Sequence, residues 1–207
     1  MRRLIEIAFP RDGIVGEEFG ALNADADYVW VLDPIDGTKS FISGVPLFGT
    51  LIALTYRGKP VLGVIDQPVA RERWIGAAGR KTTFNGRAIR TRRCPRLSDA
   101  TLYATSPDMF AKGNAAAFAR LRRKVKLARF GADCYAYGLL ASGFIDLVVE
   151  ADLKPYDFCA LQPVIEGAGG RMSDWQGRPL TLKSDGRVIA SGDQTLLTKA
   201  RAVLTGR

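Results

Sequence analysis

The sequence predicts an α/β fold, a layered α+β sandwich in which an antiparallel sheet half is followed by an α/β half. Up to residue 97, β-rich segments follow one another with short turns between them. From residue 98 onward, strand-like and helix-like segments alternate. A connection rich in arginine and proline, residues 91–98, separates the two patterns. We therefore place a boundary there, between an N-terminal half (1–97) and a C-terminal half (98–207).

The first half is expected to be a helix end followed by a meandering sheet. Residues 2–9 have the spacing of the last turns of an amphipathic helix, and Pro10 ends it. Asn85-Gly86 is a strong signal for a two-residue hairpin turn. The β-rich segments are residues 28–32, 48–58, 61–68, 73–79 and 82–90.

The second half is expected to pack helices on a sheet. The predicted strands are residues 101–106, 127–131, 144–150 and 188–193, and the predicted helices are residues 114–126, 134–142 and 195–204. Residues 156–168 also have a helical period, but Pro163 lies inside them and should kink that helix or shift its start. Residues 171–180 have the pattern of a hairpin.

The composition restricts the chemistry that the chain can perform. The 207 residues include no histidine, which removes the usual general base and the usual zinc ligand. The three cysteines, Cys94, Cys134 and Cys159, lack metal-type spacing and are expected to be core thiols rather than disulfides. Catalysis must therefore rely on carboxylates, hydroxyls, backbone amides and metal.

The net charge of +9 gathers in two basic runs, residues 90–96 and 120–126. These runs lack the interleaved aromatic residues typical of nucleic-acid binding, so a solvated basic face is expected and no nucleic-acid partner. No apolar run is long enough to span a bilayer, and the first residues do not resemble a signal peptide. The sequence therefore predicts a cytoplasmic location and no membrane partner.

Two aspartates, Asp33 and Asp36, follow the apolar strand 28–32. Pro34 restricts the turn between them, and the Ile35 carbonyl is free to face the same point as both carboxylates. These three hard oxygens would form half of a cation site. The alternative is an ordinary Asp-rich surface turn, which would need neither the strand before it nor a helix after it.

The next two residues are suited to a phosphate group. Gly37 has no side chain to block a close approach, and the amides of Gly37 and Thr38 would be free donors at the start of a helix. Asp36, Gly37 and Thr38 are therefore expected around the phosphate, beside the cation.

The segment from Asp33 to Thr38 resembles the signature of the inositol monophosphatase family of metal-dependent phosphatases. The resemblance implies an αβαβα layered sandwich and further metal ligands at Glu17, in Gly16-Glu17-Glu18, and at Asp157. Taken alone, Glu17 would be a solvated acidic residue and Asp157 a helix N-cap.

Four carboxylates would then converge: Glu17, Asp33, Asp36 and Asp157. Such a cluster repels itself without cations, so we expect it to hold two or three Mg²⁺ ions, with Mn²⁺ as a possible substitute. The expected reaction is in-line attack on phosphorus by a metal-activated water that Glu17 and Thr38 orient. The rival mechanism makes Asp33 a nucleophile that forms an aspartyl phosphate.

The segment GADCYAYGLLASG and the Lys39-Ser40-Phe41 run look most like the histidinol-phosphate phosphatase branch of the family. The expected substrate-binding residues are Asp133, Glu150 and Asp157. The resemblance implies the role of Glu150, which lies seven residues before Asp157, where inositol phosphatases place a carboxylate that contacts the leaving group. Two carboxylates there, Asp133 and Glu150, would suit a cationic alcohol. Asp133 could equally be a helix N-cap. The small phosphorylated substrate would be histidinol phosphate, and the enzyme would act in histidine biosynthesis.

Two other functions stay open at this point: hydrolysis of inositol-1-phosphate or another sugar phosphate, and non-catalytic binding of phosphate or RNA. Family members resembling this chain often form homodimers, which is the expected assembly. They also generally begin with a helical segment ahead of the position of Met1. The sequence is therefore expected to lack an acidic motif that supports the catalytic threonine.

Overall fold

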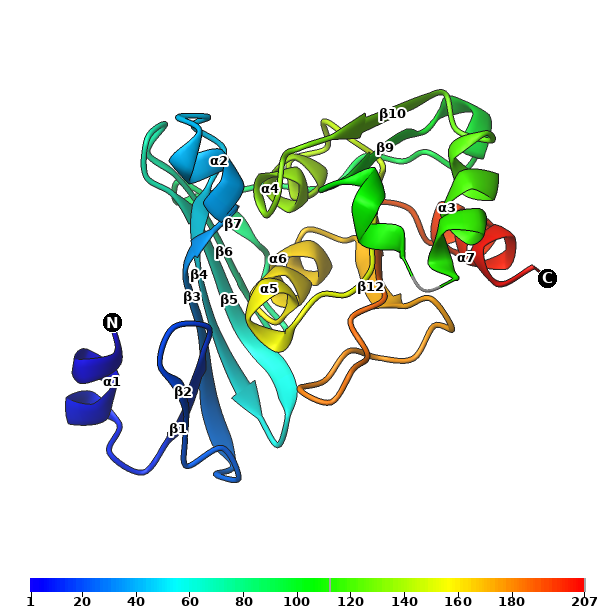
Figure 1. Ribbon diagram of the computed structural model, residues 1–207. Helices are drawn as coiled ribbons and strands as arrows, with labels where there is room; N and C mark the ends of the chain where they lie inside the picture. The colour runs from blue at the N-terminus through cyan, green and yellow to red at the C-terminus, as the bar shows by residue number, and fades with distance from the viewer. Residues whose placement is uncertain (112, 207) are drawn as a thin grey trace.

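The computed structural model describes residues 1–111 and 113–206. Its first half forms one twisted, mostly antiparallel sheet with the strand order β2-β1-β3-β4-β5-β6-β7-β8 (Figure 1). Only β1 and β3 pair in parallel. The strands are β1 (Gly13–Gly16), β2 (Gly20–Leu22), β3 (Tyr28–Asp36), β4 (Gly49–Tyr56), β5 (Lys59–Gln67), β6 (Glu72–Ala77), β7 (Thr83–Phe84) and β8 (Arg87–Ala88).

The second half forms a five-stranded mixed sheet with the order β10-β9-β11-β13-β12. Strands β10, β9 and β11 are parallel, and β13 is antiparallel to both of its neighbours. The strands are β9 (Thr101–Ala104), β10 (Leu127–Phe130), β11 (Leu147–Glu150), β12 (Arg171–Asp174) and β13 (Val188–Ser191).

Helices fill the space between the sheets and cover the far face of the second one (Figure 1). The helices are α1 (Arg2–Ala8), α2 (Thr38–Ile42), α3 (Asn114–Arg122), α4 (Tyr135–Ala141), α5 (Pro155–Phe158), α6 (Leu161–Gly167) and α7 (Gln194–Thr205), with short 3₁₀ turns at Leu97–Asp99 and Pro107–Phe110. Helices α4 to α6 bury their apolar residues in the core between the sheets. Helices α3 and α7 pack against the other face of the second sheet. The predicted α/β layered fold is confirmed.

Two glycines allow α6 to lie directly on the first sheet. Gly63 of β5 and Gly76 of β6 are paired in register. A Cβ atom at either position would collide with the backbone of the helical segment, at Ala160 and Pro163 respectively. This close approach places α5, which immediately precedes α6, beside β3 and therefore beside the end of the strand that carries Asp33.

Most predicted elements are present, with three corrections. The helix predicted at residues 156–168 is two helices, because α5 ends at Phe158 and a new helix, α6, begins at Leu161. Pro163 lies in the first turn of α6, where a proline is tolerated. The helix expected at residues 114–126 already ends at Arg122. The hairpin predicted at residues 171–180 is wrong: β12 pairs with β13 instead, although Asp174 and Arg178 do form the tight turn.

The three cysteines are free and buried, as expected. Within the described part of the chain, no helix is both long and apolar enough to cross a membrane. The location and the division into two halves stay predictions.

Candidate active site

The end of β3 carries two aspartates that a regular strand would not place together. Residues three apart in a strand point to opposite faces of the sheet. Between Asp33 and Asp36 the pairing of β3 with β4 is irregular, which brings both carboxylates to the same side. The Ile35 amide donates to Asp33 Oδ1 (3.0 Å), and the Thr50 hydroxyl donates to the Pro34 carbonyl (2.8 Å), so the irregular turn is fixed from both sides.

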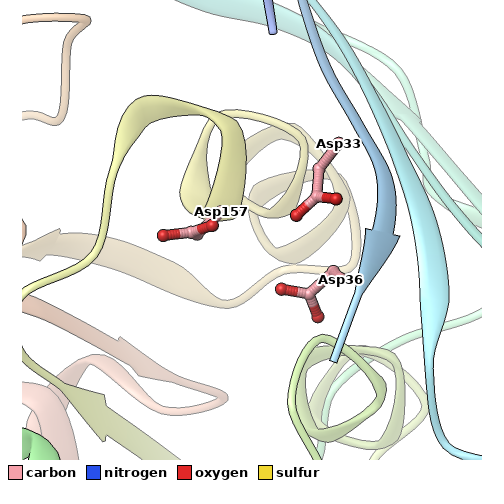
Figure 2. A group of neighbouring side chains, drawn as sticks. All are labelled: Asp33, Asp36 and Asp157. Atoms are coloured by element: carbon pink, nitrogen blue, oxygen red, sulfur yellow. The ribbon is translucent and has the colours of Figure 1, made fainter. Parts of the chain in front are cut away.

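A third carboxylate comes from α5. Figure 2 shows the side chains of Asp33, Asp36 and Asp157 directed toward one common space. Each offers an oxygen, and these oxygens lie within 4.8 Å of one another. Asp157 Oδ2 accepts a hydrogen bond from the Lys154 amide (2.7 Å). Asp157 is therefore not the N-cap of α5, which is Lys154; it lies in the first turn, closes a capping box there and also faces the other two carboxylates.

The three carboxyl groups bind protons more tightly than isolated aspartates do. Burial, followed by the charges of Asp36 and Glu17, raises the pKa of Asp33 to about 8. Burial raises the pKa of Asp36 to about 7, and burial followed by the charge of Glu17 raises that of Asp157 to about 6. Uptake of either a proton or a cation therefore relieves the repulsion among these carboxylates.

Glu17 lies just after β1, where its amide donates to the Leu32 carbonyl of β3 (3.3 Å). Its charge contributes to the raised pKa of Asp33 and Asp157, so it borders the cluster without belonging to the group of three. The Ile35 carbonyl accepts a hydrogen bond from the Thr38 hydroxyl (3.2 Å). The roles of Glu17, Ile35 and Thr38 as metal ligands or catalytic groups stay predictions.

Gly37 connects the cluster to α2. Its φ of 83° is left-handed, a conformation that glycine adopts without strain, and no side chain caps the first turn of the helix. A Cβ at Gly37 would lie only 2.8 Å from Oδ2 of Asp133. The requirement for glycine therefore arises from the neighbouring carboxylate as well as from the turn itself.

Asp133 does not cap α4, whose N-cap is Cys134 with no side-chain hydrogen bond. Its carboxylate instead accepts a hydrogen bond from the Ser40 hydroxyl (2.7 Å), and the Cys134 amide donates to Asp36 Oδ2 (2.7 Å). Sequence reasoning missed Ser40 and Cys134 because these contacts join residues 93 and 98 positions apart.

Glu150 ends β11 and is only 3% exposed. One of its oxygens accepts from the amide and the hydroxyl of Thr105, and the other accepts from the Tyr137 hydroxyl (2.8 Å). Burial raises its pKa, and the charge of Asp133 adds to the effect, so these two carboxylates are electrostatic neighbours. The substrate-binding roles of Asp133, Glu150 and Asp157 stay predictions.

The donors at the cluster fit a hard divalent cation. They are carboxylate and carbonyl oxygens, which Mg²⁺ and Mn²⁺ prefer. Softer ligands are not available here, because the sequence contains no histidine and burial raises the pKa of the Cys134 thiol further above its usual range. The arrangement can therefore hold cations beside a phosphate group.

Comparison with known proteins agrees with this chemistry. The bifunctional phosphatase IMPL2 of Arabidopsis thaliana, a chloroplastic protein, is 56% identical over 200 residues, which are 92% of this chain and 58% of IMPL2. The chain thus spans less than two thirds of the length of that relative. The histidinol-phosphatase of Chlorobaculum parvum is 35% identical over 92% of this chain and 74% of its own.

A solved inositol monophosphatase from Zymomonas mobilis shares the fold, with a TM-score of 0.94 and 51% identity over 99% of this chain and 79% of the other. The sequence model of the inositol monophosphatase family matches residues 1–205. Because that match covers nearly the whole chain and includes every residue of the carboxylate cluster, the chain belongs to the inositol monophosphatase family.

Proposed function

We propose that this chain is a Mg²⁺-dependent phosphate-monoester hydrolase whose substrate is histidinol phosphate. The observation that carries the proposal is the convergence of Asp33, Asp36 and Asp157 beside the first turn of α2. A cluster of buried carboxylates next to a helix start would suit a cation and a phosphate bound side by side.

Asp33, Asp36, Asp157 and the Ile35 carbonyl would hold the cations, with Glu17 as a further ligand. When bound, Mg²⁺ would balance the charge of the phosphate and lower the pKa of water, and Mn²⁺ could replace it. The residues of the chain supply the remaining functions of the site.

Glu17 and the Thr38 hydroxyl would orient the attacking water, and the amides of Gly37 and Thr38 would bind phosphate oxygens. Water adds to phosphorus on the side opposite the ester oxygen and gives up one proton. The phosphorus–oxygen ester bond breaks, and the leaving alkoxide takes up one proton to become the alcohol, so the protons balance. This reaction forms inorganic phosphate without a covalent phosphoenzyme. Asp33 faces the other two carboxylates as a ligand would, which is an argument against the rival role of nucleophile.

The choice of substrate rests on the second pair of carboxylates. Asp133 and Glu150 would place negative charge where the leaving alcohol lies, which favours a cationic alcohol such as histidinol over a neutral polyol. Hydrogen bonds from Thr105 and Tyr137 hold the Glu150 carboxylate in place. Relatives named histidinol-phosphatase support this choice, whereas the name of the Zymomonas mobilis structure favours inositol phosphate as the alternative.

Phosphate release from histidinol phosphate and from inositol-1-phosphate, each with and without Mg²⁺, tests both parts of the proposal. Turnover of histidinol phosphate that needs Mg²⁺ and exceeds that of inositol-1-phosphate is the expected result. Preference for inositol-1-phosphate would overturn the substrate but leave the reaction class intact. Absence of turnover on both, together with salt-sensitive retention on RNA, would favour the non-catalytic alternative.

The chain is also proposed to act as a homodimer, as the resemblance implies. Sedimentation at micromolar concentration checks this, and a monomer that retains full activity would contradict it.

A further inference from the structure

Helix α2 carries Thr38 and follows Gly37, yet very little of it is packed against the rest of the molecule. Its one buried residue is Ser40, which is 9% exposed, while Phe41 and Ile42 are 47% and 76% exposed. A five-residue helix is too short to be stable by itself. The position of the Gly37–Thr38 turn therefore depends on the contacts that α2 makes with other elements.

One such contact is the hydrogen bond from the Ser40 hydroxyl to Asp133 Oδ2 (2.7 Å), which joins α2 to the segment that precedes α4. The same carboxylate lies against Gly37, as shown by the collision that a Cβ there would cause. Asp133 thus contacts Gly37, the first residue of the turn, and Ser40, the third residue of α2.

The residue after Asp133 holds the other side of the turn. The Cys134 amide donates to Asp36 Oδ2 (2.7 Å), so two consecutive residues of the second half contact Asp36, Gly37 and Ser40 of the first. Asp133 has a φ of 45°, a left-handed conformation that is uncommon outside glycine. In this conformation the Asp133 carboxylate and the Cys134 amide both face the Gly37–Thr38 turn.

We propose that Ser40 is a positioning residue for phosphoryl transfer, acting through Asp133 to hold the Gly37–Thr38 turn against the carboxylate cluster. The inference rests on the proposed hydrolase function and deepens it by giving Asp133 two separable roles. Its hydrogen bond to Ser40 fixes the turn for every substrate, whereas its charge favours a cationic leaving group.

Three substitutions separate these roles. Ser40→Ala removes the hydrogen bond and leaves the Asp133 charge. Asp133→Asn removes the charge and keeps an oxygen that accepts from Ser40. The matched control is Ser43→Ala at the C-cap of the same helix, because the Ser43 hydroxyl donates to carbonyls of α2 itself, those of Lys39 and Ser40.

Steady-state kinetics with saturating Mg²⁺ is the first readout. Ser40→Ala should lower kcat on the order of 10- to 100-fold on histidinol phosphate and inositol-1-phosphate alike, and should weaken inhibition by inorganic phosphate, since a misplaced turn affects both. Ser43→Ala should stay within about twofold of the parent. Asp133→Asn should lose about 10-fold on histidinol phosphate and little on inositol-1-phosphate.

Hydrogen–deuterium exchange of the metal-free protein is the second readout, and it does not depend on turnover. Peptides covering residues 37–44 should exchange faster in Ser40→Ala than in the parent and in Asp133→Asn, while peptides from β9 and β11 should be unchanged. If the parent hydrolyses neither ester, the proposed function fails, and this exchange pattern alone decides whether Ser40 holds the turn.

Three outcomes would overturn the inference. Kinetics and exchange of Ser40→Ala that match those of Ser43→Ala would show that the hydrogen bond holds nothing. A loss in Ser40→Ala confined to histidinol phosphate would make Ser40 a specificity residue instead. An equal loss on both esters in Asp133→Asn would assign the effect to the charge rather than to the hydrogen bond.

Discussion

Asp33 and Asp146 are equally buried, each 1% exposed, but their charges are balanced in different ways. Asp146 accepts two hydrogen bonds from the Arg92 guanidinium (2.6 and 2.7 Å) and one from the Thr101 amide (2.8 Å). Asp33 accepts one from the Ile35 amide, and among residues 1–111 and 113–206 no lysine or arginine forms an ion pair with it.

The difference separates a buried carboxylate whose charge the chain itself compensates from one whose charge it leaves uncompensated. Burial of a charge is costly unless a partner compensates it. The chain supplies that partner for Asp146, which lies where the connection between the halves meets the second sheet. For Asp33 the charges that act on the carboxyl group are those of other carboxylates, so the partner that we propose is an external cation. The following predictions test this difference, beginning with the largest expected effect.

Asp36→Asn should abolish Mg²⁺-dependent turnover, by about 10³-fold or more, because loss of one ligand charge removes several kcal/mol of stabilisation from the bound cations. The metal-free variant should be at least as stable as the parent, since one of three mutually repelling carboxylates is gone. Phosphate release and thermal unfolding without metal measure the two effects. Retained activity would refute the metal assignment.

Asp146→Ala should have the opposite effects to Asp36→Asn: it should lower stability and leave turnover nearly unchanged. It leaves Arg92 without its partner and should lower the free energy of unfolding by about 3 kcal/mol, the lower end of the range for a broken buried pair because the Arg92 side chain is 45% exposed. Turnover per folded molecule should change little. Urea unfolding, with activity normalised to the folded fraction, checks this, and unchanged stability would remove the contrast with Asp36→Asn.

Mg²⁺ should stabilise the parent by about 2.7 kcal/mol at a concentration 100-fold above its Kd. The stabilisation should depend on pH. The raised pKa of Asp33, about 8, means that the metal-free fold binds a proton that the unfolded chain releases near pH 4. The metal-free fold therefore loses stability as the pH rises from about 4 through about 8.

Protons compete with Mg²⁺ for the same oxygens, so at a fixed Mg²⁺ concentration the gain in Tm should be larger at pH 8 than at pH 5. Asp36→Asn is the matched control, because it should show a much smaller gain at either pH. An equal gain in parent and variant would mean that the ion binds elsewhere.

The sequence alone revealed Asp33 and Asp36 because their signal is local: an apolar strand, a proline and a glycine within a few residues. It gave no sign of Asp146, whose partner Arg92 is 54 residues away, nor of the pairing of Ser40 with Asp133. The wrong prediction of a hairpin at residues 171–180 has the same origin. The turn in this segment is local, but its strand β12 pairs with β13, which lies further along the chain. Pairing over long distances is set by how the layers pack, which a linear pattern does not record.

Glu150→Gln addresses a third kind of buried carboxylate, one that only neutral donors surround. A glutamine fits the same contacts, because its oxygen can accept from Thr105 and its amide can donate to the Tyr137 hydroxyl oxygen. The variant should therefore fold normally. Loss of the charge should lower kcat/KM for histidinol phosphate about 10-fold and leave inositol-1-phosphate nearly unchanged, since only the first has a cationic leaving group.

The ratio of kcat/KM for the two esters, parent against variant, measures this effect, and Thr105→Val serves as a control that disturbs the same carboxylate without removing its charge. Equal losses on both esters in Glu150→Gln would show that Glu150 only supports β11 and its neighbours. A loss confined to histidinol phosphate would show that Glu150 resembles Asp33 rather than Asp146: its buried charge would be compensated by a partner from outside the chain. That partner would be the substrate instead of a metal ion.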